Sequence, residues 1–377
     1  MARRGENIYK RKDGRWEARM IRNYGSRGKA VYYYLYGRTC KEVKPKIFEP
    51  LYQDIQKKVE AGENDVLFET VLDAWLCNSR IKLKESSHAK YLNIINNHIK
   101  PSLGRVGITK ISSTLLNEFA TSKLSSGKRN EGGGLSEKTV KDIMSVVKSV
   151  LKFAKEESLL TNNSFNINLP RGRIAEMRVF SKDEQVMLES YLHSDLDECK
   201  LGIILCLYTG LRIGEICALK WSDISLAENT LTVRHTMQRV QVFDGTASRK
   251  TKIIITDPKS VCSARIIPLP ECVSTKLISF CPSSPTAFFL TGDSQRYIEP
   301  RTYQNKFKAY VADSGVNEAN FHTTRHTFAT RCVEVGFEIK SLSEILGHAN
   351  VNITLNRYVH SSFDLKRRNM SKLSYLQ

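Results

Sequence analysis

A histidine, an arginine and a second histidine lie within five positions of one short basic segment. In "HTTRHTFATR", His322 and Arg325 are three residues apart, so a helix through this segment would place both side chains on one face. Basic groups gathered on one helix face are well suited to bind an anion, because guanidinium and imidazole groups donate strong hydrogen bonds to charged oxygens. The segment is therefore predicted to be part of an anion-binding site.

Four further segments of the C-terminal half carry residues of related chemical character. They are "TGLRIGEI" with Arg212, "TDPKSVCSARIIPL" with Lys259, "LGH" with His348 and "NRYVH" with Tyr358. Together with the first segment they supply two arginines, one lysine, two histidines and a tyrosine. This combination suits a phosphodiester and a nucleophile, and it has no place for a metal ion.

Each residue type has a task in phosphoryl transfer. Two guanidinium groups can hold the non-bridging oxygens, and these bonds strengthen as negative charge develops. Lys259 can protonate a departing sugar oxygen, and strand-like stretches on both sides predict that it sits at a hairpin tip. A histidine can accept the tyrosine proton or bind a phosphate oxygen. Tyr358 would then form a covalent phosphoester, which splits one exchange into two reversible steps.

Several other chemistries are disfavoured. The sequence contains no P-loop, no EF-hand loop and no H-E-x-x-H, and its carboxylates do not converge as in a two-metal nuclease. We therefore predict that neither a metal ion nor ATP is required, since a phosphotyrosine would retain the energy of the broken bond. The nine cysteines are odd in number and none are spaced as C-x-x-C, which predicts reduced thiols rather than zinc ligands or disulfides.

The charge of the chain points to a polyanionic partner. Lys and Arg number 58 against 39 Asp and Glu, a net charge of +19, and nucleic acid is the usual partner of such a surplus. Residues 1–46 carry 14 basic and 4 acidic side chains. A basic disordered tail is one interpretation; three strand-like stretches and an Asp13-Gly14 turn favour a three-stranded sheet with one helix. The side chains predicted to contact DNA there are Arg11, Lys12, Arg15 and Arg19.

The length of 377 residues and the patterning predict three domains. Residues 1–62 form the basic sheet domain, and residues 63–172 form an all-helical domain. The apolar stripes of the latter are predicted to be bundle core rather than a binding groove, with Ser136 as a helix N-cap. Residues 173–377 form a mixed, mainly helical domain with a small antiparallel sheet, which opens on a Ser181–Glu184 capping box. The sequence shows no secretory signal and no apolar run long enough for a membrane span, so we expect a cytoplasmic protein.

The ordered set resembles the tyrosine recombinases, or lambda-type integrases, over residues 174–377. "TGLRIGEICALKW" and "LGHANVNITLNRYVH" look like the two signature boxes of that family, and "PKSVCSARIIPL" looks like its lysine-bearing hairpin. Glu215 stands where the family often has an acidic supporting residue. The helical segment resembles a core-binding domain, and the basic sheet resembles the arm-binding domain of phage and conjugative-transposon integrases. "EVKPKIFEPL" departs from the pattern, because prolines interrupt it where related proteins often have an unbroken helix.

The resemblance implies a site-specific DNA recombinase that integrates and excises a mobile element through a 3′-phosphotyrosyl intermediate. In that interpretation Tyr358 is the nucleophile, and Lys259 is the general acid. The remaining catalytic residues, which stabilise the transition state or assist proton transfer, are Arg212, Arg325, His322 and His348. The enzyme would act as a homotetramer on core and arm attachment sites of the bacterial nucleoid. Similar integrases commonly work with an excisionase and a host DNA-bending protein, and the sequence leaves open whether this chain needs either.

Two other functions share parts of this pattern. A type IB topoisomerase uses the same chemistry but lacks a preference for one short sequence and does not exchange strands between two duplexes. A DNA-binding regulator that had kept the fold would be expected to have lost the tyrosine or an arginine, and all are present.

Several individual residues and one segment lie outside this catalytic set. His326 and His360 are interpreted as ordinary structural histidines. Ser263 and Arg265 flank the lysine segment; Arg265 is predicted to contact DNA, although either residue could simply complete a strand. The C-terminal segment "DLKRRNMSKLSYLQ" is predicted to pack against a neighbouring subunit.

Overall fold

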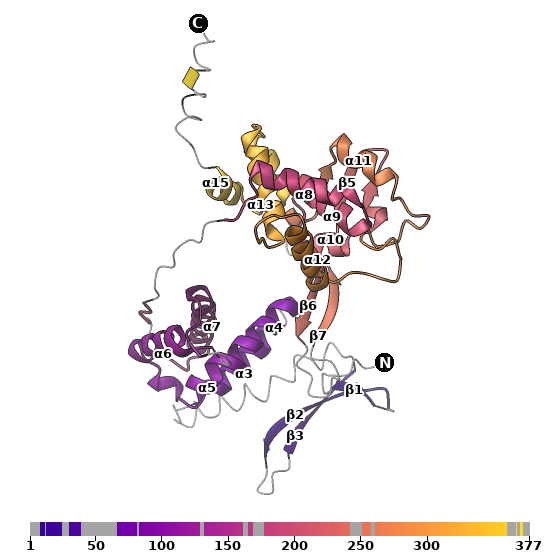
Figure 1. Ribbon diagram of the computed structural model, residues 1–377. Coiled ribbons are helices and arrows are strands. Elements are labelled where there is room, and N and C mark those ends of the chain that lie inside the picture. Colours follow the sequence, from indigo (N-terminus) through magenta and orange to yellow (C-terminus); the bar gives the residue numbers. More distant parts are fainter. Residues whose placement is uncertain are drawn as a thin grey trace. The chain divides into compact units, whose positions relative to one another are not determined.

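The chain consists of two compact units (Figure 1). The computed structural model describes residues 8–11, 13–24, 30–38, 66–80, 83–128, 132–160, 165–168, 177–241, 251–257, 261–359, 367 and 370–371. The N-terminal unit spans residues 1–174 together with 240–252, and the C-terminal unit spans residues 175–239 together with 253–377. Lys12, Lys259 and His360 lie outside the described residues, as do the helix expected after the N-terminal sheet and most of the C-terminal segment.

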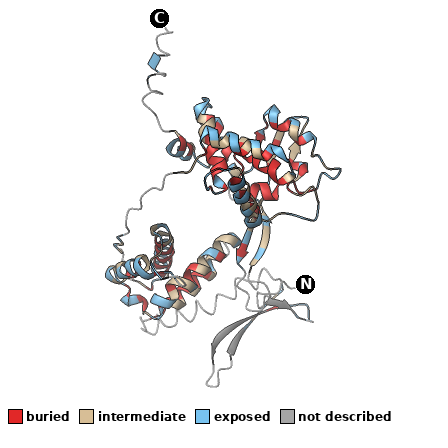
Figure 2. Cartoon of the chain, in the orientation of Figure 1, coloured by how far each residue is buried: buried red, intermediate tan, exposed pale blue. Residues whose placement is uncertain are grey.

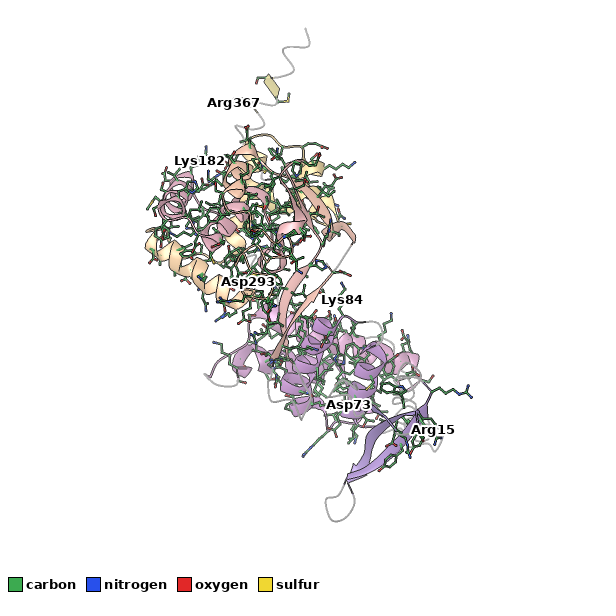
Figure 3. All side chains as sticks on the ribbon, turned by 90° about the vertical axis from the view of Figure 1, so that its right-hand side faces the viewer. Arg15, Asp73, Lys84, Lys182, Asp293 and Arg367 are labelled. Atoms are coloured by element: carbon green, nitrogen blue, oxygen red, sulfur yellow. The ribbon has the colours of Figure 1, made fainter. Side chains whose placement is uncertain are left out.

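The basic N-terminus contains the expected antiparallel sheet of three strands, in the order β1-β2-β3. The strands are β1 (Ile8–Lys10), β2 (Trp16–Tyr24) and β3 (Ala30–Gly37). The turn between β1 and β2 contains Asp13 and Gly14, as expected. Gly14 has a φ of +85°, a conformation that a glycine adopts without steric cost. Arg15 lies at this end of the sheet (Figure 3).

The helical part of the N-terminal unit has a core built from the two predicted apolar stripes. Its elements are α3 (Phe68–Arg80), α4 (Glu85–Ile94), a π-helical turn (Ile95–Ile99), α5 (Lys100–Leu103), a 3₁₀ turn (Ile108–Lys110), α6 (Ser113–Ser126) and α7 (Glu137–Glu156). The backbone N–H of Thr139 donates to the Ser136 hydroxyl at 3.2 Å, which confirms the predicted N-cap of α7. Ile95, Ile143 and Val147 are fully buried, so the stripes are core. Among the described helices, none is long and apolar enough to cross a membrane.

The C-terminal unit is mainly helical and has a small antiparallel sheet, and two of its strands run on into residues 240–252, which the N-terminal unit includes. Its elements are α8 (Lys182–Ser194), α9 (Glu198–Thr209), α10 (Ile213–Ala218), a 3₁₀ turn (Trp221–Asp223), β4 (Ile224–Ser225), β5 (Thr230–Val233), β6 (Thr236–Gln241), β7 (Thr251–Thr256), a 3₁₀ turn (Val261–Ser263), β8 (Arg265–Pro268), α11 (Glu271–Ile278), α12 (Pro300–Asp313), α13 (His322–Glu334), α14 (Ile339–Leu346) and α15 (Val351–Tyr358). The predicted capping box of α8 is present, with Ser181 and Glu184 each bonding the other's backbone N–H. Helix α9 is buried on almost all sides and packs against α8, α11 and α13 (Figure 2).

The strands on either side of Lys259 do not pair with each other, so the predicted hairpin is wrong. Strand β7 pairs with β6, whereas β8 pairs with β5 in the sheet ordered β4-β5-β8. The register of β5 and β8 sets Leu231 opposite Ile267, and both side chains are buried in the main core. Burial of this pair explains why β8 takes β5 as its partner. Lys259 itself, between β7 and β8 in the sequence, is outside the described residues.

Candidate active site

Helix α13 begins at His322, so the basic segment that contains His322 and Arg325 is helical as expected. One helical turn also separates His322 from His326, and their rings meet edge to face with centroids 4.5 Å apart. His322 is exposed, whereas His326 is buried and Arg325 is only 1% exposed. The helix therefore presents one cation and two imidazoles to the same neighbourhood.

Arg325 is held by backbone carbonyl groups of two different helix ends. Its Nη1 donates to the Gly210 oxygen at 2.6 Å, and its Nη2 donates to the Leu346 oxygen at 2.5 Å. Gly210 ends α9 with a φ of +65°, which turns its carbonyl away from the helix axis. Burial, and then the charge of Arg212, lowers the pKa of Arg325 to about 9, so this guanidinium remains charged at neutral pH.

Arg212 stands at the start of α10 and is anchored by Glu215 and Gly347. Its Nη1 donates to Glu215 Oε1 at 2.7 Å, its backbone N–H donates to Glu215 Oε2 at 3.0 Å, and its Nη2 donates to the Gly347 oxygen at 3.2 Å. Gly347 ends α14 with a φ of +63°, and a Cβ atom there would lie 3.0 Å from the Cys262 carbonyl oxygen and from Arg265 Cδ. A glycine is therefore required where this carbonyl meets Arg212.

Arg265 completes a set of three arginines at the C-terminal end of α14. Its Nε donates to the Ile345 oxygen at 2.5 Å, and its two terminal nitrogens donate to the Glu215 carboxylate at 2.9 and 3.2 Å. The carbonyls at a helix C-terminus carry partial negative charge and have no partners within the helix. Arg265 thus donates to the carbonyl of Ile345, Arg325 to that of Leu346, and Arg212 to that of Gly347. We refer to these three arginines and their carbonyl partners as the arginine clamp.

Glu215 is the buried anion that balances this positive charge. Burial alone would raise the pKa of its carboxyl group, but the charge and hydrogen bonds of Arg265, and then those of Arg212, outweigh burial and hold the pKa at about 2. Glu215 is 5% exposed. It is therefore ionised at neutral pH, as the acidic supporter that the sequence suggested would be.

Replacing Glu215 with glutamine is expected to lower the free energy of unfolding of the C-terminal unit by about 3–5 kcal/mol, because two guanidinium groups lose a buried counterion. The folded pKa of Glu215 lies below its ordinary value of 4.5, so its contribution is complete above pH 4.5 and is lost as the pH falls toward 2. The difference between wild type and Glu215→Gln should therefore shrink across this interval. This difference in the free energy of unfolding is measured by urea titration, with hydrogen exchange of peptides from α10 and β8 as the readout.

Glu184→Gln is the matched control for this experiment. Glu184 also has a pKa of about 2, chiefly because of a hydrogen bond from Arg178, but it balances one arginine at a less buried position. Glutamine preserves its place in the capping box. If Glu215→Gln lowered the free energy of unfolding no more than Glu184→Gln does, the role of Glu215 as counterion of the arginine clamp would be contradicted.

Tyr358 is the last residue of α15 and lies beside two histidines. Its side chain is 5% exposed, and its hydroxyl lies 2.9 Å from His326 Nδ1. The ring of His348 lies parallel to the Tyr358 ring, with centroids 6.5 Å apart, and His348 Nδ1 lies 2.9 Å from the hydroxyl of the fully buried Thr354. Burial raises the pKa of Tyr358, although the charges of Arg325 and Arg357 oppose this effect.

The three histidines of the site are neutral at physiological pH. Partial desolvation, followed by electrostatic interactions with His326 and Arg325 that disfavour a second protonated ring, lowers the pKa of His322 to about 4. Burial and the neighbouring arginines lower the pKa of His326 to about 4 and that of His348 to about 3. Neutral imidazoles can accept protons, whereas imidazolium groups cannot. In the described part of the chain, no group of three His, Cys, Asp or Glu side chains is arranged to hold a metal ion.

The structure brings together the predicted site residues that it describes. These are Arg212 at the start of α10, His322 and Arg325 on α13, His348 after α14 and Tyr358 at the end of α15. The predicted general acid, Lys259, lies outside the described residues. Arg265 is buried against Glu215, and its predicted contact with DNA stays a prediction. Ser263 offers its carbonyl oxygen to Arg265 at 3.1 Å.

His326 is the site residue that the sequence interpretation missed. The sequence alone suggests a structural histidine at this position, yet His326 is the partner of the Tyr358 hydroxyl. A signal was present, since His326 follows His322 by four residues and therefore shares its helix face. That signal placed the side chain in the site but could not identify its partner, which is 32 residues further along the chain.

The basic residues predicted to contact DNA at the N-terminus are partly described. Arg11 pairs with the buried Glu17 at 2.6 Å, and Arg15 pairs with Asp13 at 2.9 Å. Both guanidinium groups also lie near the exposed ring of Tyr36, at 5.4 and 5.8 Å from its centroid. Arg19 is in β2, but its side chain is outside the description, as is Lys12. The described sheet thus presents an aromatic ring next to two arginines.

Comparison with known proteins identifies two family matches in the chain. The model of the phage integrase family matches residues 188–364, and the model of the phage integrase N-terminal SAM-like domain matches residues 67–124. A "Tyrosine recombinase XerC-like" protein of Caldanaerobacter subterraneus subsp. tengcongensis is 28% identical over 357 residues, which cover 88% of this chain and 89% of the relative.

Two solved structures show that the fold is shared. The Tn1549 transposon integrase in complex with a circular intermediate DNA has a TM-score of 0.66 at 22% identity, over 80% of this chain and 99% of that chain. A lambda integrase tetramer bound to a Holliday junction has a TM-score of 0.57 at 17% identity, over 95% of this chain and 98% of that chain.

These matches agree with the expected fold class and with the resemblance noted in the sequence. The small N-terminal sheet, the helical domain and the mainly helical domain with its small antiparallel sheet are all confirmed. The chain belongs to the phage integrase family and is a tyrosine-type site-specific recombinase, an enzyme that breaks and rejoins DNA.

Proposed function

We propose that this recombinase integrates and excises a mobile element, with Tyr358 as its nucleophile. The tyrosine oxygen attacks a specific phosphodiester, forms a 3′-phosphotyrosine and releases a 5′-hydroxyl. That hydroxyl then attacks the phosphotyrosine of a partner strand, so the reaction consumes neither ATP nor metal-bound water. The observation that carries this proposal is the position of Tyr358, whose buried hydroxyl lies 2.9 Å from a neutral imidazole beside two arginines.

Arg212 and Arg325 hold the non-bridging oxygens of the attacked phosphate. Arg212 is suited to this because its side chain remains 34% exposed while Glu215 fixes its direction. Arg325 is buried, and its carbonyl partners hold its planar group in one orientation. Donors that are oriented in advance stabilise developing charge without a cost of reorganisation during the reaction.

Proton transfer involves the remaining members of the set. Lys259 protonates the departing 5′-oxygen, because a lysine ammonium is a compact proton donor on a flexible stem. His322 and His348 bind the phosphate and assist proton transfer, and Glu215 supports the arginines. Arg265 is proposed to approach DNA at the edge of the site while it remains paired with Glu215.

The enzyme is proposed to act as a homotetramer on core and arm attachment sites of a bacterial chromosome. The lambda integrase structure is a tetramer on a Holliday junction, and the Tn1549 structure is a complex with a circular transposon intermediate. The similarity to a transposon integrase supports a conjugative transposon over a phage as the element. An excisionase and a host DNA-bending protein would then act as directional partners.

Covalent capture from a random pool of duplexes tests this function without knowledge of the attachment site. The protein is incubated with the pool in EDTA and without ATP, and DNA that remains attached after denaturation is sequenced. We expect one short sequence to be enriched, which we call the selected site. Two different duplexes that carry the selected site should then exchange strands and give recombinant products.

Two other outcomes would reject the proposal. Captured DNA without any shared sequence, together with relaxation of supercoiled plasmid and no exchange, would indicate a topoisomerase. Enrichment of one sequence by binding alone, with no covalent product, would indicate a DNA-binding regulator.

The N-terminal sheet is expected to bind DNA separately from the cleavage site, through side chains that include Arg15. Changing Arg15 to glutamine should weaken binding to a random 30-base-pair duplex. The slope of the logarithm of the binding constant against the logarithm of salt concentration should become shallower by about one, since one phosphate contact is lost. Covalent capture at the selected site should be unchanged. The control is Lys308→Gln, which removes the charge of a lysine on α12 that pairs with Glu318. An unchanged slope for Arg15→Gln would contradict this role.

A further inference from the structure

His326 has a direct contact with the proposed nucleophile that its expected structural role does not explain. Its Nδ1 lies 2.9 Å from the Tyr358 hydroxyl, and both side chains are buried. We propose that His326 is a catalytic residue that accepts the Tyr358 proton as the tyrosine attacks DNA. This inference rests on the proposed function, because it assigns the proton acceptor for the nucleophile of that same reaction.

Two packed helices fix the geometry of this pair. His326 lies in the first half of α13, Tyr358 ends α15, and the two helices are in contact. A separation of 2.9 Å between the hydroxyl oxygen and the ring nitrogen is within the range expected for a general base and its proton donor. The packing of α13 against α15 therefore holds the acceptor within hydrogen-bond distance of the nucleophile.

The charges around His326 keep it ready to accept a proton. Burial, and then the charges of Arg357 and Arg325, lower its pKa to about 4, so the ring is neutral at physiological pH. A bound phosphodiester would bring a negative charge next to the same arginines and offset their effect. The basicity of His326 should therefore rise when the scissile phosphate is in place, which is when a proton acceptor is needed.

The other two histidines are placed for different tasks. His348 directs its Nδ1 to the Thr354 hydroxyl at 2.9 Å, and its ring lies parallel to that of Tyr358 rather than pointing at the oxygen. His322 is exposed and meets the ring of His326 edge to face. We assign His326 to the attacking oxygen, whereas His322 and His348 remain available to the phosphate.

In the proposed step, the bond from the Tyr358 oxygen to phosphorus forms as the bond from phosphorus to the 5′-oxygen breaks. The Tyr358 proton moves to His326 Nδ1, and the 5′-oxygen receives a proton from Lys259. Rejoining reverses both transfers, so His326 returns its proton to Tyr358 and no net proton is consumed.

A substrate with sulfur at the bridging 5′ position tests this assignment. Sulfur leaves as a thiolate without a general acid, because a thiol is far more acidic than a sugar hydroxyl, so it rescues variants defective in protonating the leaving group. We would compare the wild type, His326→Asn, His326→Phe and Lys259→Ala on a nicked duplex carrying the selected site, with oxygen or sulfur at that position. Asparagine keeps a polar atom near Nδ1, and phenylalanine keeps only the ring.

We expect both His326 variants to form the covalent adduct more slowly on the oxygen substrate, by about 10²- to 10⁴-fold. The sulfur substrate should restore Lys259→Ala and should not restore either His326 variant. Circular dichroism and DNA affinity establish that the variants are folded, and His193→Asn on the exposed face of α8 is the control for a histidine outside the site.

The inference is overturned if either His326 variant reacts at the wild-type rate, or if sulfur restores both variants. The second result would assign His326 to the leaving group. Absence of any adduct with wild type would instead reject the proposed function, so the two failures can be distinguished.

Discussion

Tyr358→Phe is expected to abolish formation of the covalent adduct, a loss of more than about 10⁴-fold, while DNA affinity is retained. Phenylalanine keeps the buried ring and removes only the oxygen that lies against His326. The folded state should lose about 1 kcal/mol of stability, the usual contribution of one hydrogen bond. A denaturing gel of wild type and variant on the selected site, together with a binding titration, measures both effects.

Tyr303→Phe provides a control with the same chemical change. Tyr303 is fully buried on α12 and donates its hydroxyl to the Cys199 carbonyl at 2.9 Å, within the main core of the C-terminal unit. It should lose similar stability and still form the adduct. An adduct with Tyr358→Phe at the wild-type level would show that another residue is the nucleophile.

Arg325→Lys is expected to slow adduct formation by about 10²- to 10³-fold, comparable to the loss of one transition-state donor. Lysine keeps the charge but presents a single ammonium group. It cannot reach the Gly210 and Leu346 carbonyls together while also holding a phosphate oxygen. Single-turnover cleavage of a nicked selected-site duplex at saturating protein measures the chemical step apart from binding.

Arg331→Lys is the control for Arg325→Lys. Arg331 is on the same helix, α13, and its guanidinium binds Glu334 and the Phe180 carbonyl away from Tyr358. Its replacement should lower stability and leave the rate of cleavage nearly unchanged. Equal rates for Arg325→Lys and wild type would contradict the proposal that a guanidinium at position 325 stabilises the transition state.

Much of the fold was predictable because local chemistry determines it. The Ser136 cap, the Ser181–Glu184 capping box and the Asp13-Gly14 turn each depend on a few neighbouring residues, and all were found. The apolar stripes of the helical domain were also found as core, since a helix must bury its apolar face. The pairing of β8 with β5 was not predicted, because it depends on which distant strand shares the buried surface around Leu231.

The site was predictable as a set of residue types but not as a set of contacts. Arg212 and Arg325 stand in ordered motifs, so their place in the candidate site could be predicted from the sequence. Apart from Glu215, their partners are the backbone carbonyls of Gly210, Leu346 and Gly347, and any residue type carries a carbonyl. His326 was missed for a related reason, since only the packing of α13 against α15 reveals its contact with Tyr358.

The attachment point of the covalent adduct is the most direct test of the central claim. Protein trapped on the selected site in EDTA would be digested with protease and nuclease, and the remaining peptide–nucleotide conjugate would be sequenced by mass spectrometry. We predict a phosphodiester between the Tyr358 oxygen and a DNA 3′ end. A conjugate at another residue, or at a DNA 5′ end, would contradict the account.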